Sequence, residues 1–212
     1  MLKSLQKRIV KRIIQRAVTR PLVKDVVRYA HREVDESGPL YLAQEQREAD
    51  RLGVYVGDYL QQKGWDDPSD FVGAFLRPRL HPAAEVVEIG PGTGRFARHV
   101  QKAVPEGRLH LFEKDEWWRE YLRSRLFGSE RNVVVHECDG YSLSGIYDSS
   151  IDLVYAKGVF TYLPTMVFFR YLDEVCRVLR AEGSLVFNFH DHDDLEIALA
   201  FVDGNIQPTP NV

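Results

Sequence analysis

The sequence predicts an α/β fold in which a doubly wound, mostly parallel sheet of about five strands follows a helical N-terminal extension. Two observations indicate this fold. From Ala84 onward, apolar runs of strand length alternate with segments of helical periodicity. A glycine-rich turn, 90–94, joins the first apolar run to the first of these helices. Such alternation is typical of a parallel sheet covered on both faces.

The elements of this sheet follow in order. We expect strands at 85–89, 109–113, 132–136, 151–156 and 184–189, and helices at 94–104, 116–126 and 166–180. We assign 83–212 to this domain, which looks short at its C-terminus. Only one further apolar segment, 194–202, is suited to a helix, and a Pro-Thr-Pro tail follows it. The fifth strand should therefore lie at or near an edge, without a closing hairpin. An open edge favours pairing with a second copy, so a homodimer is one expectation.

The first 24 residues predict a basic amphipathic helix. They hold eight of the 28 basic residues and no acid, and Leu2, Leu5, Ile9 and Ile13 recur at helical spacing. Three interpretations remain open. Residues 1–20 suit peripheral membrane contact, an arginine-rich organelle transit peptide has a similar composition, and an ordinary helix would pack its apolar stripe on the domain.

Residues 25–82 form a mixed-charge region that predicts a helical extension or lid. Helical periodicity is clearest from Leu42 to Leu60, and turn signals stand on either side at Gly38-Pro39 and at 64–68.

Charge and cysteine content limit the setting. Residues 25–212 retain 20 basic against 31 acidic residues, a net charge of −11, which disfavours binding to a phosphate backbone. Two cysteines provide neither a disulfide framework nor a metal-ligand spacing. No apolar stretch approaches the ~20 residues of a transmembrane helix. We therefore expect a cytoplasmic protein, with peripheral membrane contact as an open addition.

The glycine turn is the strongest functional signal. Gly90, Gly92 and Gly94 follow an acidic strand end at Glu88, and glycine lets a ligand approach the backbone. A dinucleotide fingerprint requires a glycine where Arg95 stands, which disfavours NAD.

Acidic residues end the next two expected strands. Glu113 lies 19 residues after Gly94, where a carboxylate accepts hydrogen bonds from ribose hydroxyls. Asp139 suits an exocyclic amino donor, and Gly140 lets the backbone pass close to a ring. In open α/β sheets ligands bind at this edge.

The run 84–189 resembles the class I, Rossmann-like methyltransferases, in the branch that reads D-L-V-x-x-x-x-V-x-x-x-L-P and then E-V-x-R-V-L-x-P-G-G. The resemblance implies S-adenosylmethionine as cofactor. It places Glu88, Gly90, Gly92 and Gly94 at the methionine and ribose end, Glu113 on the ribose, Asp139 and Gly140 on the adenine, and Lys157 near the methionine. The sequence departs from the pattern at Lys157 and at Ala181-Glu182.

Other residues have competing interpretations. His190 and His192 follow the fifth strand and are candidate general bases, whereas we expect no metal at this acidic loop. Trp117 and Trp118 open a helix, where one of them flanks the adenine or both pack in the core.

The function expected from these features is methyl transfer to a small-molecule, sugar or lipid-linked acceptor, at oxygen. The segment after the fourth strand lacks the Asn/Asp-Pro-Pro-Tyr/Phe motif of enzymes that methylate nucleobases, which disfavours a nucleic acid. Two alternatives remain, a catalytically inactive S-adenosylmethionine-binding accessory protein and, less favoured, an NAD-dependent oxidoreductase.

Overall fold

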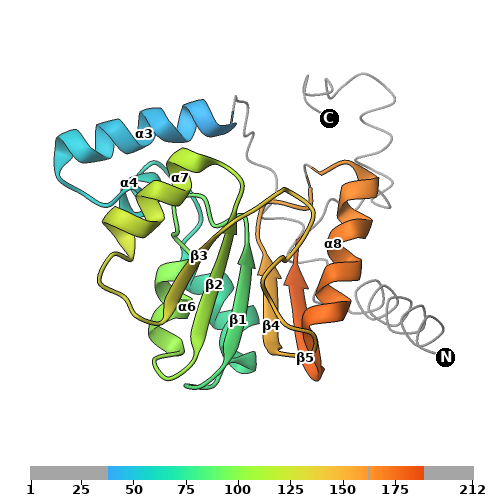
Figure 1. Cartoon of the computed structure of the whole chain (residues 1–212). Helices are drawn as coiled ribbons and strands as arrows, with labels where there is room; N and C mark the ends of the chain where they lie inside the picture. The colour runs from blue at the N-terminus through green and yellow to red at the C-terminus, as the bar shows by residue number, and fades with distance from the viewer. Residues whose placement is uncertain (1–37, 162, 189–212) are drawn as a thin grey trace, which may run out of the picture.

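A computed structural model describes residues 38–161 and 163–188, and it confirms the predicted sheet (Figure 1). Five parallel strands lie in the order β3-β2-β1-β4-β5. Their bounds are Glu85–Ile89 (β1), Arg108–Glu113 (β2), Val133–Glu137 (β3), Ile151–Ala156 (β4) and Leu179–Phe187 (β5). The first four lie within one residue of the predicted ranges, because short apolar runs bounded by turns mark buried strands clearly.

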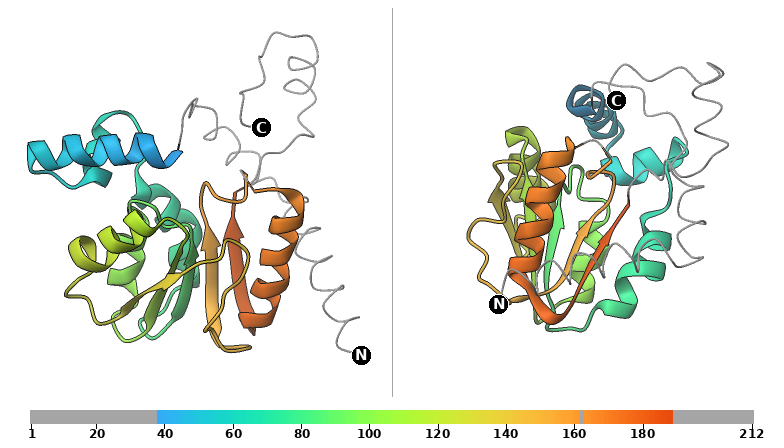
Figure 2. Two further views of the ribbon diagram at one scale, coloured as in Figure 1. Left: turned by 45° about the horizontal axis from the view of Figure 1, so that its top comes forward. Right: turned by 90° about the vertical axis from the view of Figure 1, so that its right-hand side faces the viewer.

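Both faces of the sheet are covered, as Figure 2 shows. Strand side chains alternate between the faces. One face packs against α6 (Ala97–Ala103), α7 (Glu116–Glu120) and its π-helical continuation η3 (Tyr121–Leu126), through Val86, Leu109, Leu111, Leu153 and Tyr155. The other packs against α8 (Thr165–Val178), through Val87, Ile89, Phe112, Val154 and Ala156. The sheet is therefore doubly wound, as predicted.

The region before the sheet is helical, but its boundaries differ from the prediction. The helix expected around 42–60 is two helices, α3 (Gly38–Leu52) and α4 (Val56–Gln62). Gly53 separates them with a φ of +70°, a conformation that ends helices and that periodicity does not reveal. Gly38-Pro39, expected as a turn, opens α3, because proline is tolerated in the first turn.

Short helices lead from α4 to the sheet. They are α5 (Pro68–Phe71), the π-helix η1 (Val72–Leu76) and the 3₁₀ turn η2 (Arg77–Arg79). Val56, Leu60, Phe71, Val72 and Leu76 are buried in the same core as α6 and the sheet. This packing places the segment over the face of the sheet that carries α6.

Two further boundaries correct the prediction. The fifth strand starts at Leu179 rather than 184, because Leu179 pairs with Ile151 and an irregularity then shifts the register to Leu153 and Ser184. The residues 181–183, which the prediction left between the last helix and the fifth strand, are therefore extended. Helix α6 starts at Ala97 rather than 94, since residues 95 and 96 form a further turn after the glycine turn.

Among the described strands, β5 lies at the sheet edge, as predicted. Residues 1–37 and 189–212, which include the expected basic helix 1–24 and the expected helix 194–202, lie outside the described residues. Among residues 38–161 and 163–188, no helix is long and apolar enough to span a membrane.

Candidate functional site

The candidate site lies at the carboxyl ends of β1 and β4. From β1 the chain passes to α6 on one face, and from β4 it passes to α8 on the other. Strand order reverses between these neighbours, which is where ligands bind in open α/β sheets. The loops that follow β1, β2, β3 and β4 all meet at this edge, visible at the top of the sheet in Figure 1.

The glycine turn after β1 is closed by hydrogen bonds within the protein. The Gly90 N–H donates to the Phe112 carbonyl at 2.9 Å and the Gly94 N–H to the Pro91 carbonyl at 2.8 Å. The Gly92 N–H donates to Glu113 Oε2 at 2.9 Å. These donors are therefore used internally, and what the turn offers a ligand is mainly space.

That space exists at only one of the three glycines. All three have positive φ, +67° at Gly90, +50° at Gly92 and +74° at Gly94. A Cβ at Gly90 would lie 2.5 Å from Val159 Cγ2, and one at Gly94 would lie 2.4 Å from Leu126 Cδ2. At Gly92 it would meet nothing within 4 Å. Gly90 and Gly94 thus serve close packing, whereas Gly92 faces open space.

Glu113, at the end of β2, links the glycine turn to the second loop. Its side chain is buried, with Oε2 accepting from Gly92 and Oε1 accepting from the Asp115 N–H at 2.9 Å. Burial raises the pKa of Glu113, and the backbone donors oppose this rise. A carboxylate offers about four lone-pair directions, and the Gly92 and Asp115 N–H groups use two of them.

Glu88 lies beneath the site rather than in it. It is 2% exposed, and its Oε2 accepts a hydrogen bond of 2.5 Å from the Tyr155 hydroxyl. Burial raises the pKa of Glu88 to about 8, so this carboxyl is mostly protonated at neutral pH. The contact joins the ends of β1 and β4, and Glu88 holds the two strands in register instead of facing the edge.

Asp139 organises the loop after β3. Its Oδ1 accepts from the N–H groups of Tyr141 and Ser142, and its Oδ2 accepts from the Ser142 hydroxyl at 2.6 Å. Burial raises the pKa of Asp139, but these donors outweigh it and leave the pKa lowered. Gly140 has a φ of +91°, and a Cβ there would lie 3.4 Å from Lys114 Cδ. The side chain of Lys114 therefore lies between the second and third loops, a position that the sequence did not reveal.

Lys157 follows β4 and points toward the helical region. Its Nζ lies 3.8 Å from Asp66 Oδ2 and 5.7 Å from the centre of the Phe71 ring. Arg95, the residue after the glycine turn, donates from Nη2 to Asp66 Oδ1 at 2.9 Å and also to the Asp66 carbonyl. Sequence analysis missed Asp66 because it belongs to a turn 29 residues before Arg95.

A second contact joins the helical region to the glycine turn. The Tyr55 hydroxyl donates to the Thr93 carbonyl at 2.8 Å, and burial raises the pKa of Tyr55, so it remains a donor. The Arg98 guanidinium stacks 4.0 Å from the centre of the Tyr55 ring. The segment 55–71 is thus fixed to the turn at two points.

Comparisons with known proteins agree with this fold. A family model described as a methyltransferase domain matches residues 86–183. Residues 86–183 are therefore similar to a class I, Rossmann-like methyltransferase domain. The malonyl-[acyl-carrier protein] O-methyltransferase of Methylococcus capsulatus is 30% identical over 127 residues, which cover 58% of this chain and 44% of that protein.

Two more relatives of the methyltransferase domain differ in their named activities. The ribosomal RNA small subunit methyltransferase A of Lawsonia intracellularis is 35% identical over 65 residues, covering 31% of this chain and 24% of that protein. A solved phosphoethanolamine N-methyltransferase 1 of Haemonchus contortus, in complex with phosphoethanolamine and S-adenosylhomocysteine, aligns with a TM-score of 0.50 and 25% identity, covering 57% of this chain and 24% of its own. The chain spans less than half the length of each of these relatives.

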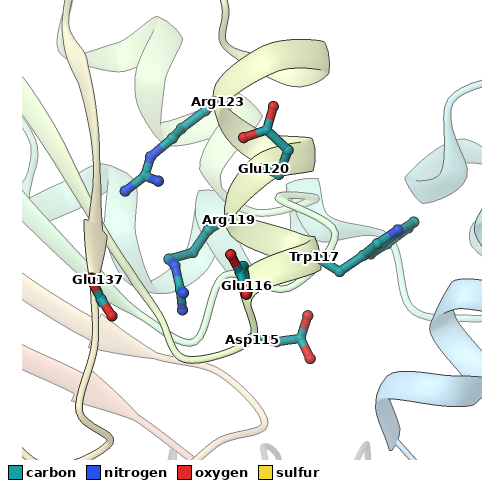
Figure 3. Close-up of a pocket in the computed structure, with 7 residues that line it drawn as sticks. All are labelled: Asp115, Glu116, Trp117, Arg119, Glu120, Arg123 and Glu137. Carbon is teal, nitrogen blue, oxygen red and sulfur yellow. The ribbon is translucent and has the colours of Figure 1, made fainter.

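A surface hollow of about 720 Å³ lies beside the candidate site, between α7 and the edge strand β3 (Figure 3). Arg119, Arg123 and Glu137 line it, and Figure 3 shows both arginines pointing toward β3 while Trp117 points away. Arg123 donates to the Val135 carbonyl at 2.9 Å, so it occupies an acceptor of the edge strand. Of the residues that the sequence analysis considered for the cofactor site, Trp117 alone is among those that line this hollow.

The remaining candidates divide between core and surface. Trp118 is buried in the core, whereas Trp117 is 45% exposed. His190 and His192 lie outside the described residues. The described histidines include a pair that the sequence did not single out: His110 Nδ1 lies 2.9 Å from His136 Nε2, on the neighbouring strands β2 and β3.

Proposed function

We propose that the protein binds S-adenosylmethionine at the carboxyl edge of β1 and β4 and transfers its methyl group to an oxygen of a small-molecule, sugar or lipid-linked acceptor. The observation that carries the proposal is the unfilled space at Gly92 beside the buried carboxylate of Glu113. A nucleoside fits this combination for two reasons. Its ribose presents two hydroxyls to a carboxylate, and its close approach to the protein backbone requires a residue without a Cβ.

Each predicted residue has a role in this proposal, in which Lys157 lies near the methionine end of the cofactor. Glu113 accepts hydrogen bonds from the ribose hydroxyls, and Asp139 with Gly140 borders the adenine. Gly92 leaves room for the ligand, while Gly90, Gly94 and Glu88 maintain the shape of the turn and the strands beneath it.

The bound cofactor supplies an electrophilic methyl group on a sulfonium. The protein contributes alignment and the exclusion of water. The contacts of Tyr55 and Asp66 fix the segment 55–71 to the glycine turn. These contacts support the proposed role of the segment as a lid over this edge. His190 and His192 remain the proposed bases for an acceptor hydroxyl, outside the described residues.

An oxygen acceptor is supported by the O-methyltransferase relative, which covers more of this chain than the ribosomal RNA relative does. The latter favours a nucleic acid as a second candidate acceptor. The acidic charge of residues 25–212 weighs against that candidate. Peripheral membrane contact through residues 1–20 and a homodimer remain further proposals.

Calorimetric titration with S-adenosylhomocysteine and with NADH tests the cofactor. We expect saturable binding of the first and none of the second. Binding of NADH alone would contradict the proposal. Binding of S-adenosylhomocysteine without turnover, across panels of carboxylate, hydroxyl and RNA acceptors, would instead identify an accessory protein. Methylation of RNA but of no small acceptor would favour the second candidate.

A further inference from the structure

Two histidines meet on the face of the sheet that packs against α8. His110 lies on β2 two residues before Phe112, so both side chains point to the same face. His136 lies on β3, and its ring stacks on the Phe112 ring, with centres 4.5 Å apart and planes at 3°. His110 Nδ1 and His136 Nε2 are 2.9 Å apart. The stack on Phe112 thus holds the second imidazole with a nitrogen toward the first.

A carboxylate orients His110 from the opposite side of its ring. Glu85, at the start of β1, places Oε2 3.2 Å from His110 Nε2. A carboxylate only accepts hydrogen bonds, so Nε2 of His110 carries the ring proton and Nδ1 keeps its lone pair. Histidines that ligate metals are commonly fixed in this way, by a carboxylate on the nitrogen that does not ligate. His110 therefore presents Nδ1 to His136 in the tautomer of a metal ligand.

Both imidazoles are also in the charge state that metal ions bind. Burial lowers the pKa of His136 to about 4, with His110 and Arg123 contributing. Burial lowers the pKa of His110 as well, against the opposing effect of Glu85. Both rings are therefore neutral at pH 7, and protons compete little with a metal ion there.

The pair is accessible from solvent. The His110 side chain is 12% exposed, and His136 is half-buried. The chain passes from β3 to β4 without an intervening helix, so no crossover helix of that connection covers the pair. Water and a small ion can therefore reach the two nitrogens.

We propose that His110 and His136 bind a divalent first-row transition metal ion, with Cu²⁺ bound more tightly than Zn²⁺. Two imidazole nitrogens at about 2.0–2.1 Å from one ion are about 2.9–3.4 Å apart in square-planar or tetrahedral geometry. The observed 2.9 Å therefore requires only a small rotation of the rings. The ring proton of His136 moves from Nε2 to Nδ1 through solvent, so no proton is released.

The protein supplies two ligands to this site. Among residues 38–161 and 163–188, no group of three or more metal-ligating side chains lies close enough to hold an ion. Water completes the coordination, and Glu85 is a positioning residue because it contacts only the far nitrogen of His110. The ion joins the edge strand β3 to β2, so its binding should stabilise the folded state.

Titration of the full chain with CuCl₂ and with ZnCl₂ tests the site. We expect tighter binding of Cu²⁺, a raised melting temperature, and an electron paramagnetic resonance spectrum of Cu²⁺ with two nitrogen ligands. His136→Phe, which retains a ring against Phe112, and His110→Gln should each abolish this spectrum. Glu85→Ala should weaken Cu²⁺ binding about 10–100-fold without removing either nitrogen from the spectrum.

Matched controls come from the other histidines. His81→Ala and His99→Ala remove histidines that lie outside the pair, and they should leave the affinity for Cu²⁺ unchanged. The double variant His190→Ala, His192→Ala addresses the acidic loop outside the described residues, and it should retain the spectrum with two nitrogens. Thermal unfolding of each variant without metal measures any loss of folded protein.

The opposite results would overturn the inference. They are an unchanged Cu²⁺ spectrum in both His136→Phe and His110→Gln, or loss of the spectrum in the double variant alone. A parent chain whose affinity for Cu²⁺ equals that of His136→Phe would overturn it as well, because the pair would then be a hydrogen bond of the sheet and no ligand.

Discussion

The two sides of the candidate site are built from different parts of the chain. On the β2 side, the Gly92 N–H donates to the side-chain carboxylate of Glu113, which joins the glycine turn to the end of the neighbouring strand β2. On the β4 side, Lys157 and Arg95 meet Asp66 from the helical region. The first side is shaped by backbone and by the absence of a side chain, whereas the second depends on tertiary docking of charged side chains. Mutations should therefore affect the two sides differently.

The largest expected effect is at Gly92. Gly92→Val should abolish binding of S-adenosylhomocysteine, because the new side chain enters the space that Gly92 leaves open. The φ of +50° adds a strain of about 1–2 kcal/mol, so most of the protein should remain folded. Calorimetry and thermal unfolding measure the two effects separately.

Gly94→Val is the matched control. Its side chain would collide with Leu122 and Leu126, so we expect a greater loss of stability than at Gly92, since overpacking costs about 1–3 kcal/mol beyond the backbone strain. Retained affinity in Gly92→Val, or a lower melting temperature for Gly92→Val than for Gly94→Val, would show that the wrong glycine has been assigned to the ligand.

Glu113→Ala should weaken binding by a few kcal/mol at most. The variant loses the proposed acceptor for ribose hydroxyls and also leaves the Gly92 N–H without its partner, and hydrogen bonds to charged groups contribute about 1.5–3 kcal/mol. Titration with adenosine as well as S-adenosylhomocysteine measures the ribose contribution. An equal affinity of parent and variant for both ligands would contradict the role of Glu113.

Glu88 joins the two sides beneath the site, and its effect should appear in the pH dependence of stability. Its folded pKa of about 8 lies above the ordinary value of 4.5, so the folded state binds the proton more tightly. Stability should fall as pH rises from about 4.5 to 8. Glu88→Gln removes this ionisation and should be more stable than the parent at pH 8, by at least about 1 kcal/mol. Denaturant unfolding at pH 5 and pH 8 measures the difference, and identical slopes in parent and variant would contradict it.

The smallest effect is expected at His136, on the edge strand β3 beside β2. Burial lowers its pKa to about 4, with His110 and Arg123 contributing. The unfolded state therefore takes up the proton first, and stability should fall as pH drops from about 6.5 to 4. His136→Phe retains an aromatic ring against Phe112, whose centre lies 4.5 Å away. The variant should reduce the pH dependence of stability in acid by the uptake of up to one proton. Its ligand affinity should stay unchanged. A steeper acid loss in the variant would exclude His136 as its source.

The sequence predicted the sheet because its signals are local. The strands β1 to β4 were located within one residue, since an apolar run followed by a turn is recognisable without knowledge of its neighbours. The break at Gly53 and the early start of β5 were missed. The first depends on a single positive φ, and the second on pairing with Ile151, far along the chain.

The sequence by itself determined the fold, the glycine turn and the acids at the strand ends, because each is a property of consecutive residues. Only the tertiary structure decided what those residues do. It separated Gly92, which faces open space, from Gly90 and Gly94, which accommodate Val159 and Leu126. It turned Glu88 toward Tyr155 and brought Asp66 to Arg95 and Lys157. The physical reason is that close packing and charge pairing act between atoms near in space, whatever their separation along the chain.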